Sequence, residues 1–266
     1  IDIPIVTTLH GTDITLLGKD KSFKPVIEYA INQSDAVTAV SKDLKKETPQ
    51  YFNINNEIKS IPNFIDMSLY KQEDDMKLRN CFAKDDEFIL THVSNFRKVK
   101  RVEDVIHIFN KVNKEIPAKL LMIGDGPERL KAEQLCRKLE ICDKVKFLGK
   151  LKVIEKMLSI SDVFILPSAT ESFGLVALEA MASKVAVIST NTGGLPEVNI
   201  DGETGFLSEV GDVNKMAIDT LSLLKDKEKL NTFKENALAH AYTFDLPNIL
   251  PQYEAVYQEL SCKMKS

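Results

Sequence analysis

The sequence contains no long apolar run: no stretch approaches the roughly 18 consecutive apolar residues that a membrane-spanning helix needs, and no basic-then-apolar leader opens the chain. It also lacks an excess of positive charge, because its formal net charge is −4 at pH 7. Binding of nucleic acid by general electrostatics requires a broad basic face. We therefore expect a soluble, cytoplasmic protein that binds neither a membrane nor nucleic acid.

Cysteine and metal-binding patterns are scarce as well. The four cysteines form no C-x-x-C pair and have no histidines at zinc-ligand spacing, so we expect reduced, structural thiols. There is also no D-x-D-like cluster that would present a divalent cation to a diphosphate. The sequence therefore gives no indication of a metal site.

Short β-branched apolar runs alternate with helical stretches from Glu87 onward. Nearly continuous apolarity predicts strands that are covered on both faces, and the alternation of strand and helix predicts a parallel, doubly wound sheet. The expected fold class is therefore α/β. The predicted strands are residues 88–93, 119–123, 145–148, 163–166 and 185–189, and the predicted helices are residues 102–115, 128–139, 153–159, 173–183 and 213–224.

The beginning of the chain repeats this alternation in shorter form, until residues 62–66 break the pattern. We therefore place a domain junction there and assign residues 1–66, 67–244 and 245–266 to a first domain, a second domain and a C-terminal helix that crosses back to the first. A domain usually has ~100–150 residues, so the first unit is expected to be the second half of a Rossmann-like fold with residues upstream of Ile1. The predicted strands are residues 3–9, 36–40 and 58–61, and the predicted helices are residues 23–33, 42–51 and 250–263.

The most informative segment carries two carboxylates, Glu171 and Glu179, directly after the predicted strand 163–166. A helix that opens near Phe173 has free backbone N–H groups that can face an anion, and Gly174 lets a ligand approach the backbone closely. Glu171 lies in the loop before this helix, where it can reach a sugar hydroxyl. Glu179 lies about 9 Å further along, at ~1.5 Å per helical residue, where a ribose attached to the anion could lie. The pair is therefore predicted to span a nucleotide sugar.

The alternative is that both carboxylates are solvated residues near a helix start, where negative charge suits the helix dipole. That alternative accounts for Glu171 but not for Glu179, which is the only charged residue between Phe173 and Ala182. Burial of a carboxylate without a partner is costly, so a polar ligand or a cation is expected beside Glu179.

A basic cluster follows the first strand of the second domain, with four cations among residues 97–101. The carboxyl edge of a doubly wound sheet is where ligands bind. Arg97 offers a planar fork of donors and Lys100 a point charge, so both are predicted to hold a diphosphate. A lone basic cluster is most often solvated surface, but the position at a strand end favours the phosphate clamp.

Weaker signals come from two glycines and one histidine. Gly124 and Gly149 each follow a predicted strand, where the backbone could approach a nucleotide, although ordinary strand ends look the same. His10 follows the last strand residue before a glycine-containing turn and is predicted to face the interdomain cleft, although a structural histidine is the usual explanation. His92 and His107, inside a strand and a helix, are assigned to structure.

Together these segments resemble the retaining glycosyltransferases with the GT-B fold, the family that includes glycogen synthase and sucrose synthase. The E-x7-E arrangement of Glu171 and Glu179 is the most specific element, and the basic cluster, the segment 193–197 and the segment 201–206 support it in order. The resemblance covers essentially the whole chain. It implies two Rossmann-like domains facing across a cleft, with an incomplete first domain on the acceptor side and a second domain that binds the nucleotide sugar.

The segments around His10, Arg97 and Glu171 look in particular like those of bacillithiol-pathway enzymes that join N-acetylglucosamine to L-malate. This resemblance implies a UDP-N-acetylglucosamine (UDP-GlcNAc) donor, an L-malate acceptor, retained anomeric configuration and no metal or other cofactor, and it allows a homodimer. The catalytic residues are expected to be His10, Arg97, Lys100 and Glu171. The expected substrate-binding residues are Thr8, Asn63, Ser94, Asn95, Gly124, Gly149, Ser172, Phe173, Gly174, Leu175 and Glu179.

Two departures from the family pattern and two rival functions remain. Lys184 stands where relatives commonly have glycine, so a left-handed helix cap there would be strained by ~1 kcal/mol. The family's glycine-rich first strand and loop is absent from the sequence, so the chain alone is expected to be inactive. The rivals are a UDP-GlcNAc 2-epimerase, which would need no acceptor, and a noncatalytic nucleotide-sugar-binding module.

Overall fold

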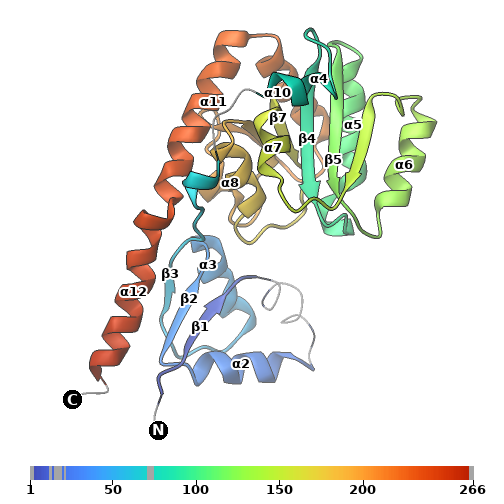
Figure 1. The fold of residues 1–266 in the computed structure, drawn as a ribbon. Coiled ribbons are helices and arrows are strands. Elements are labelled where there is room, and N and C mark those ends of the chain that lie inside the picture. Colours follow the sequence, from blue (N-terminus) through green and yellow to red (C-terminus); the bar gives the residue numbers. More distant parts are fainter. Residues whose placement is uncertain (1–2, 12–13, 15–19, 21, 71–74, 264–266) are drawn as a thin grey trace.

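A computed structural model shows two lobes, each built on a parallel sheet (Figure 1). In the smaller lobe, strands β1 (Val6–Leu9), β2 (Ala36–Ala39) and β3 (Ile58–Ser60) lie side by side in this order. Helices α2 (Lys24–Asn32) and α3 (Lys42–Tyr51) connect them. The Ser41 hydroxyl caps α3 by accepting the Leu44 N–H at 3.1 Å. The structure describes residues 3–11, 14, 20, 22–70 and 75–263.

The larger lobe contains a six-stranded parallel sheet with the order β6-β5-β4-β7-β8-β9. The chain starts in the middle of the sheet, moves to one edge, returns and continues to the other edge, which is the strand order of a Rossmann fold. The predicted α/β fold with a doubly wound parallel sheet is therefore confirmed. The strands are β4 (Phe88–Ser94), β5 (Ala118–Gly124), β6 (Val145–Gly149), β7 (Val163–Leu166), β8 (Ala186–Thr190) and β9 (Gly205–Ser208).

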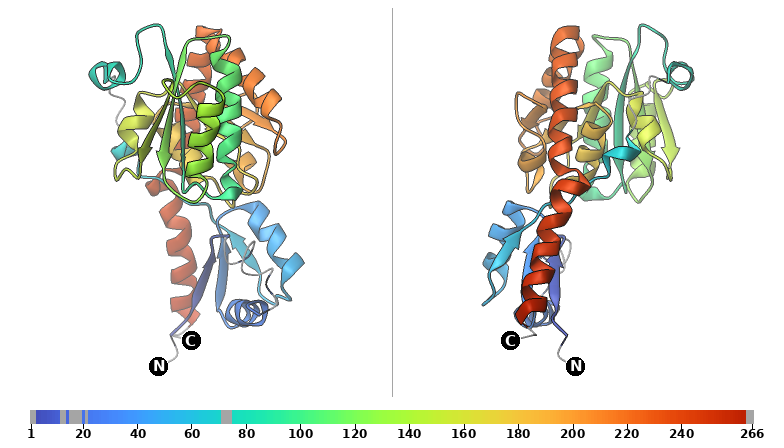
Figure 2. Two further views of the ribbon diagram at one scale, coloured as in Figure 1. Left: turned by 90° about the vertical axis from the view of Figure 1, so that its right-hand side faces the viewer. Right: turned by 60° about the vertical axis from the view of Figure 1, so that its left-hand side comes forward.

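Helices cover both faces of this sheet, and Figure 2 shows them from two further sides. Neither α11 nor β9 is among the predicted elements, and α8 begins two residues later than predicted because Gly174 has a φ of 97°, which an α-helix does not accommodate. The helices are α4 (Met76–Asn80), α5 (Val102–Asn113), α6 (Arg129–Lys138), α7 (Glu155–Ser159), α8 (Leu175–Ala182), α9 (Leu195–Val198), α10 (Val213–Leu224) and α11 (Lys227–Ala241), with short 3-10 helices η2 (Met67–Leu69), η3 (Lys98–Lys100) and η4 (Tyr242–Phe244).

One hydrophobic core is common to both lobes. Leu9 and Val37 of the smaller lobe belong to the same buried cluster as Phe164 and Phe173 of the larger lobe. A second cluster fills the other face of the large sheet around Phe109. Burial of apolar surface between the lobes therefore holds the two sheets in a common arrangement.

The C-terminal helix α12 (Leu246–Lys263) runs along the side of the smaller lobe (Figure 2). Its residues Ile249 and Val256 are buried against Ile61, and the Tyr253 hydroxyl donates to the Ile61 carbonyl at 3.3 Å. The helix starts four residues before the predicted position at Leu250. The last element of the chain therefore packs on the sheet formed by the first residues.

The chain passes between the lobes twice, and the two crossings are bonded to each other. The Ile65 N–H donates to the Phe244 carbonyl at 2.9 Å, and the Leu246 N–H donates to the Ile65 carbonyl at 2.8 Å. These crossings lie beside the junctions predicted at residues 66 and 244. None of the helices within the described residues has the length and apolarity needed to traverse a membrane.

Candidate active site

The crevice of the larger lobe lies where β4 and β7 end. These neighbouring strands lead the chain in opposite directions, β4 toward α5 and β5, and β7 toward α8 and β8. A doubly wound sheet binds ligands at such a switch point, outside the carboxyl ends of its strands. In Figure 1 the arrowheads of β4 and β5 point toward the smaller lobe. The predicted segments 94–101 and 168–179 both start at this crevice.

Two residues predicted to be catalytic are paired here. The Lys100 ammonium donates to Glu171 Oε1 at 2.5 Å, and the Ser168 hydroxyl donates to the same oxygen at 2.9 Å. The side chains of Lys100 and Glu171 are only 19% and 12% exposed. Ser168 is fully buried and is not among the predicted site residues, although its place three residues before Glu171 could have indicated it. Glu171 Oε2 accepts no hydrogen bond from the residues that the structure describes.

The basic cluster is fixed by backbone bonds. The Lys100 N–H donates to the Arg97 carbonyl at 2.8 Å, which forms the 3-10 turn η3, and the Ala169 N–H donates to the Val99 carbonyl at 2.8 Å. The second bond ties the turn to the loop that carries Glu171. The side chains of Asn95 and Arg97 are exposed. Neither makes a hydrogen bond or ion pair within the described part of the chain, so both are available to a ligand.

Glycines let the loops of the crevice approach one another. A Cβ atom on Gly193 would lie 1.8 Å from the Glu171 carbonyl oxygen, and the Gly194 N–H donates to that oxygen at 2.9 Å. A Cβ on Gly124 would lie 1.8 Å from the Ser94 carbonyl oxygen, so this predicted site residue lets the protein backbone approach closely. Gly149, with a φ of 69°, has no atom within 4 Å of its Cβ position and faces open space.

The loop before α8 divides into a buried and an accessible part. The Phe173 ring is buried and packs edge-to-face on Phe244 with 5.7 Å between centroids, so only its backbone can face a ligand. Leu175 is exposed, and Ser172 is half-buried. The first helical N–H groups, at Leu175 and Val176, have no partner within the helix.

Glu179 lies one to two turns into α8 and is largely enclosed. Burial, together with repulsion from Glu155, raises the pKa of Glu179 to about 7. The sequence predicts a polar ligand or a cation beside Glu179, and no cation lies there among the described residues. Tyr70 is a neighbour instead, and its pKa is raised by burial and by the negative charge of Glu179. A carboxylate in this position can accept hydrogen bonds from ligand hydroxyls.

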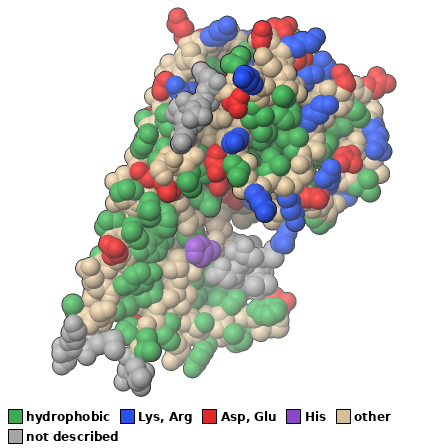
Figure 3. Space-filling model, viewed as in Figure 1, with side chains coloured by type: hydrophobic (Ala, Val, Ile, Leu, Met, Phe, Trp, Pro, Cys, Tyr) green, Lys and Arg blue, Asp and Glu red, His purple; other side chains and the backbone are tan. Residues whose placement is uncertain are grey.

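The smaller lobe contributes the end of β1 to the same region. A Cβ on Gly11 would lie 1.6 Å from Ser172 Oγ, so the turn after β1 touches the loop before α8. His10 is exposed beside this contact, and the Thr8 hydroxyl accepts from that of Thr38 at 2.9 Å. Figure 3 shows lysine and arginine side chains of the larger lobe, and a histidine of the smaller one, at the waist between the lobes. Asn63 is half-buried in the segment that joins the lobes.

Glu197 forms a polar contact between the lobes that the sequence does not predict. Its two carboxylate oxygens accept the backbone N–H groups of Lys42 and Asp43, each at 2.9 Å. These donors lie at the amino end of α3, where the helix dipole favours a negative charge. Burial and the charge of Glu197 raise the pKa of Asp43. Glu197 lies 155 residues from Lys42 in the sequence, so only the fold reveals the pair.

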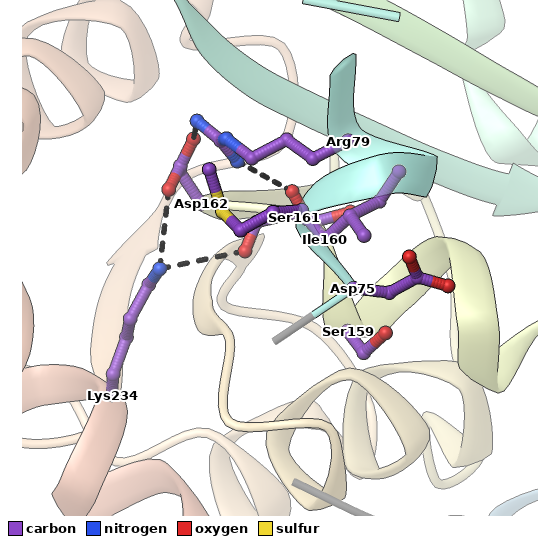
Figure 4. A pocket seen from close by; sticks show the side chains of 8 residues that line it. Asp75, Arg79, Ser159, Ile160, Ser161, Asp162 and Lys234 are labelled. Carbon is purple, nitrogen blue, oxygen red and sulfur yellow. Dashed lines mark hydrogen bonds and ion pairs between the residues drawn. The ribbon is translucent and has the colours of Figure 1, made fainter. Parts of the chain in front are cut away.

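A cavity of about 230 Å³ lies at the opposite, amino end of the large sheet (Figure 4). There Asp162 accepts from Arg79 at 2.8 Å and from Lys234 at 3.2 Å. Arg79 also donates to the carbonyls of Ile160 and Glu87. Because protein groups already pair both cations, this cluster joins α4, β7 and α11 and is not a candidate site. No group of three metal-ligating side chains occurs in the part of the chain that the structure describes.

Known proteins resemble this chain over nearly its whole length. Residues 75–240 match the family described as glycosyl transferases group 1, and residues 1–69 match glycosyltransferase family 4. The chain is 47% identical over 260 residues to the N-acetyl-alpha-D-glucosaminyl L-malate synthase of Bacillus anthracis, which covers 97% of this chain and 68% of that protein. It is 29% identical to an uncharacterized glycosyltransferase of Methanocaldococcus jannaschii, over 98% of this chain and 70% of the relative.

Solved structures resemble the fold over nearly the whole chain. The Anabaena protein HepE in complex with UDP and glucose has a TM-score of 0.89 at 25% identity, with 96% of this chain and 72% of that chain covered. The sucrose-phosphate synthase of Thermosynechococcus elongatus has a TM-score of 0.88 at 22% identity, with 99% and 69% covered. The arrangement of the two lobes is therefore shared with these proteins.

Proposed function

Because this chain belongs to the family of glycosyl transferases group 1 and has its GT-B fold, we propose that it transfers N-acetylglucosamine from UDP-GlcNAc to L-malate with retention of the anomeric configuration. The observation that carries this proposal is the 47% identity, over 97% of the chain, to the N-acetyl-alpha-D-glucosaminyl L-malate synthase. The hexosyltransferase activity and the small-molecule substrates predicted from the sequence agree with it.

The crevice supplies positive charge to the departing diphosphate. One N–H of the Lys100 ammonium is bonded to Glu171, which leaves two donors for phosphate oxygens. Arg97 is exposed in the same basic cluster, and α8 begins directly after the loop that carries Glu171. Donors that are already in place where negative charge develops lower the barrier most. The bond between the sugar and the phosphate then breaks, and the diphosphate leaves with the electron pair.

The acceptor completes the reaction on the face that the diphosphate leaves. The malate hydroxyl oxygen forms the new bond to the anomeric carbon, and its proton passes to the leaving phosphate oxygen. We assign Glu171 to accept a hydrogen bond from a sugar hydroxyl and Glu179 to accept hydrogen bonds from the ribose hydroxyls. His10 is exposed on the smaller lobe, and we assign it to contact with the sugar and the acceptor. These three assignments are inferred from position and charge.

We propose that no metal takes part, because Arg97, Lys100 and the start of α8 together offset the diphosphate charge. A chelator should then leave turnover unchanged, and restoration of activity by Mg²⁺ after chelation would contradict this. The cytoplasmic location and the homodimer stay predictions. Light scattering during gel filtration tests the second of these.

The proposed activity is tested by product analysis with a full-length protein. UDP-GlcNAc, GDP-mannose and ADP-glucose are each incubated with and without L-malate. We expect UDP and an α-linked N-acetylglucosaminyl malate from UDP-GlcNAc only when malate is present. Epimerised sugar formed without malate would establish the 2-epimerase instead, and UDP binding without any turnover would establish a binding module.

A further inference from the structure

The two central strands of the large sheet separate at the crevice. Strand β4 pairs with β5 along its whole length, from Phe88 to Ser94. It pairs with β7 at two positions only, Leu90 with Val163 and Thr91 with Phe164. The hydrogen-bond ladder between β4 and β7 therefore ends just before His92, although both strands continue toward the site.

The His92 side chain bridges this gap. Its ring is completely buried, with Nδ1 at 2.8 Å from the Ile165 carbonyl oxygen of β7 and Nε2 at 2.8 Å from Ser94 Oγ. A carbonyl oxygen only accepts, so Nδ1 carries the proton. Burial lowers the pKa of His92 to about 4 and keeps the ring neutral, so Nε2 accepts the Ser94 hydroxyl proton. The Ser94 oxygen then accepts the Phe96 N–H at 3.2 Å.

This chain of bonds ends at an unusual turn. Phe96 has a φ of 40°, a left-handed conformation that a bulky residue rarely adopts, and it is fully buried. Its ring lies nearly parallel to that of His92, at 6.1 Å between centroids. The next residue is Arg97, and η3 with Lys100 follows. On the other strand, Ile165 leads within a few residues to Ser168 and Glu171.

We propose that His92 is a positioning residue: it fixes the turn that carries Arg97 and Lys100 relative to the strand that carries Ser168 and Glu171. It touches no substrate and acts through Ser94 and the Ile165 backbone. A histidine at this place therefore sets how well the site holds a diphosphate, and not how well it holds a nucleoside. The inference depends on the proposed function only in that the ligand is a nucleoside diphosphate.

Binding of UDP and of uridine separates these two contributions. Calorimetry on the 266-residue chain gives the ratio of the uridine Kd to the UDP Kd, which measures what the diphosphate adds. In His92→Phe, which keeps a ring of similar size but removes both hydrogen bonds, we expect this ratio to fall about tenfold. A general loss of folded protein would change the binding stoichiometry and leave the ratio as it is.

Thr91→Val is the matched control. Thr91 is the neighbouring buried residue of β4, and its hydroxyl makes a 2.6 Å bond with Ser161 at the other end of the strand pair. This variant also loses a buried hydrogen bond, but its ratio should stay unchanged. His92→Asn retains an N–H near the Nδ1 position and should keep the ratio within about threefold of the wild type, which also covers the case that His92→Phe fails to fold.

A double-mutant cycle tests the route through Ser94. In a Ser94→Ala background, His92→Phe should lower the ratio about threefold instead of tenfold, because only the bond to the Ile165 carbonyl is then left to lose. A wild-type ratio in His92→Phe, or an equal fall in Thr91→Val, overturns the inference while the proposed function stands. Failure of the wild-type chain to bind UDP overturns both.

Discussion

At the residue scale, the site depends on charge shared between Lys100 and Glu171. Both side chains are mostly enclosed, and Ser168 holds the carboxylate from a second direction. A partly buried pair costs solvation, and loss of one partner leaves the other unpaired. The ion pair therefore serves to position the Lys100 ammonium at the strand ends before any ligand binds. Two of the three ammonium donors are not used by Glu171.

Lys100→Ala tests this placement. Removal of one donor to the transition state typically costs about a hundredfold in turnover, so we expect at least this loss in a full-length enzyme. Lys98→Ala, in the same 3-10 turn but exposed, removes the same charge from the cluster and should lower turnover less than about threefold. The comparison is made by initial-rate kinetics at saturating UDP-GlcNAc. Equal turnover in the Lys100→Ala variant and the wild type would exclude Lys100 from the phosphate clamp.

Glu179 predicts a dependence of stability on pH. Its pKa is about 7 in the folded protein and 4.5 in an unfolded chain. The folded state therefore binds more protons between these values, and the stability present below pH 4.5 is lost as the pH rises through 7. The Glu179→Gln variant has no carboxyl group to ionise, so it keeps this stability at high pH. Its free energy of unfolding should exceed that of the wild type by on the order of 2 kcal/mol at pH 8, with little difference at pH 4.5.

Urea denaturation at a series of pH values measures this difference. Glu155→Gln provides the control, because it removes the repulsion from Glu179 and should shift the loss of stability to lower pH. Parallel wild-type and Glu179→Gln curves across this range would show that the carboxyl is not proton-linked to folding.

At the element scale, the loop that carries Glu171 is held by glycines of the loop before α9. Gly193 has a φ of 58° and no room for a Cβ, because the Glu171 carbonyl oxygen would lie 1.8 Å away. Gly193→Ala should therefore displace the Glu171 loop and lower UDP affinity at least tenfold. This loss of affinity comes in addition to the ~1 kcal/mol of stability that an alanine with a left-handed backbone costs.

Gly202→Ala separates the clash from the backbone strain. Gly202 has a φ of 77° but no atom within 4 Å of its Cβ position. This variant should lose only about 1 kcal/mol of stability and bind UDP like the wild type. Calorimetric titration and thermal melts of both variants give the comparison. If both alanines weaken UDP binding equally, the contact with the Glu171 loop has no part in the site.

At this scale, an element can be predicted from the sequence when the residues within it determine its structure. Five strands of the large sheet, β4 to β8, are largely apolar, so their positions follow from the sequence to within one residue. The sequence gives a weak signal for α11, because only two of its four buried residues, Leu230 and Phe233, are large and apolar. It gives a weak signal for β9 as well, because this strand has four residues and begins with glycine. The left-handed cap expected at Lys184 is present, with a φ of 61°.

The site residues that can be predicted from the sequence are likewise those that stand in local motifs. Arg97, Lys100, Glu171 and Glu179 stand in motifs at strand ends, and the structure places the strand ends together. Their roles stay predictions, but their neighbourhood follows from the topology of a doubly wound sheet. His92 makes a side-chain bond between different strands, from β4 to the Ile165 carbonyl of β7. Such bonds depend on where strands separate, which no periodicity in the sequence encodes.

At the scale of the whole molecule, the described residues include three connections between the lobes that differ in kind. They are the core shared by Leu9 and Phe173, the paired crossings at Ile65 and Leu246, and the bonds from α3 to Glu197. The first connection is formed by apolar packing and the second by backbone hydrogen bonds. Of the three, only the third depends on a charged side chain. Glu197 is therefore the connection that a single substitution can remove without disturbing the core.

Glu197→Gln should loosen the lobes at α3. An amide offers one acceptor oxygen where the carboxylate offers two, and it loses the attraction between a negative charge and the helix start. We expect the backbone N–H groups of Lys42 and Asp43 to exchange with solvent deuterium at least about tenfold faster, since they now donate to the Glu197 oxygens at 2.9 Å. Hydrogen exchange followed by NMR resolves these two amides.

Glu209→Gln is the control for this last change, because Glu209 is exposed and its carboxylate makes no bond within the described residues. Exchange at Leu44, whose N–H is capped by Ser41, should stay as in the wild type in both variants, since that bond lies within one lobe. Faster exchange confined to Lys42 and Asp43 would mean that the lobes separate at this contact while α3 stays folded. Unchanged exchange at both amides would show that packing alone keeps the lobes together, and that Glu197 only occupies a helix end that solvent would otherwise cover.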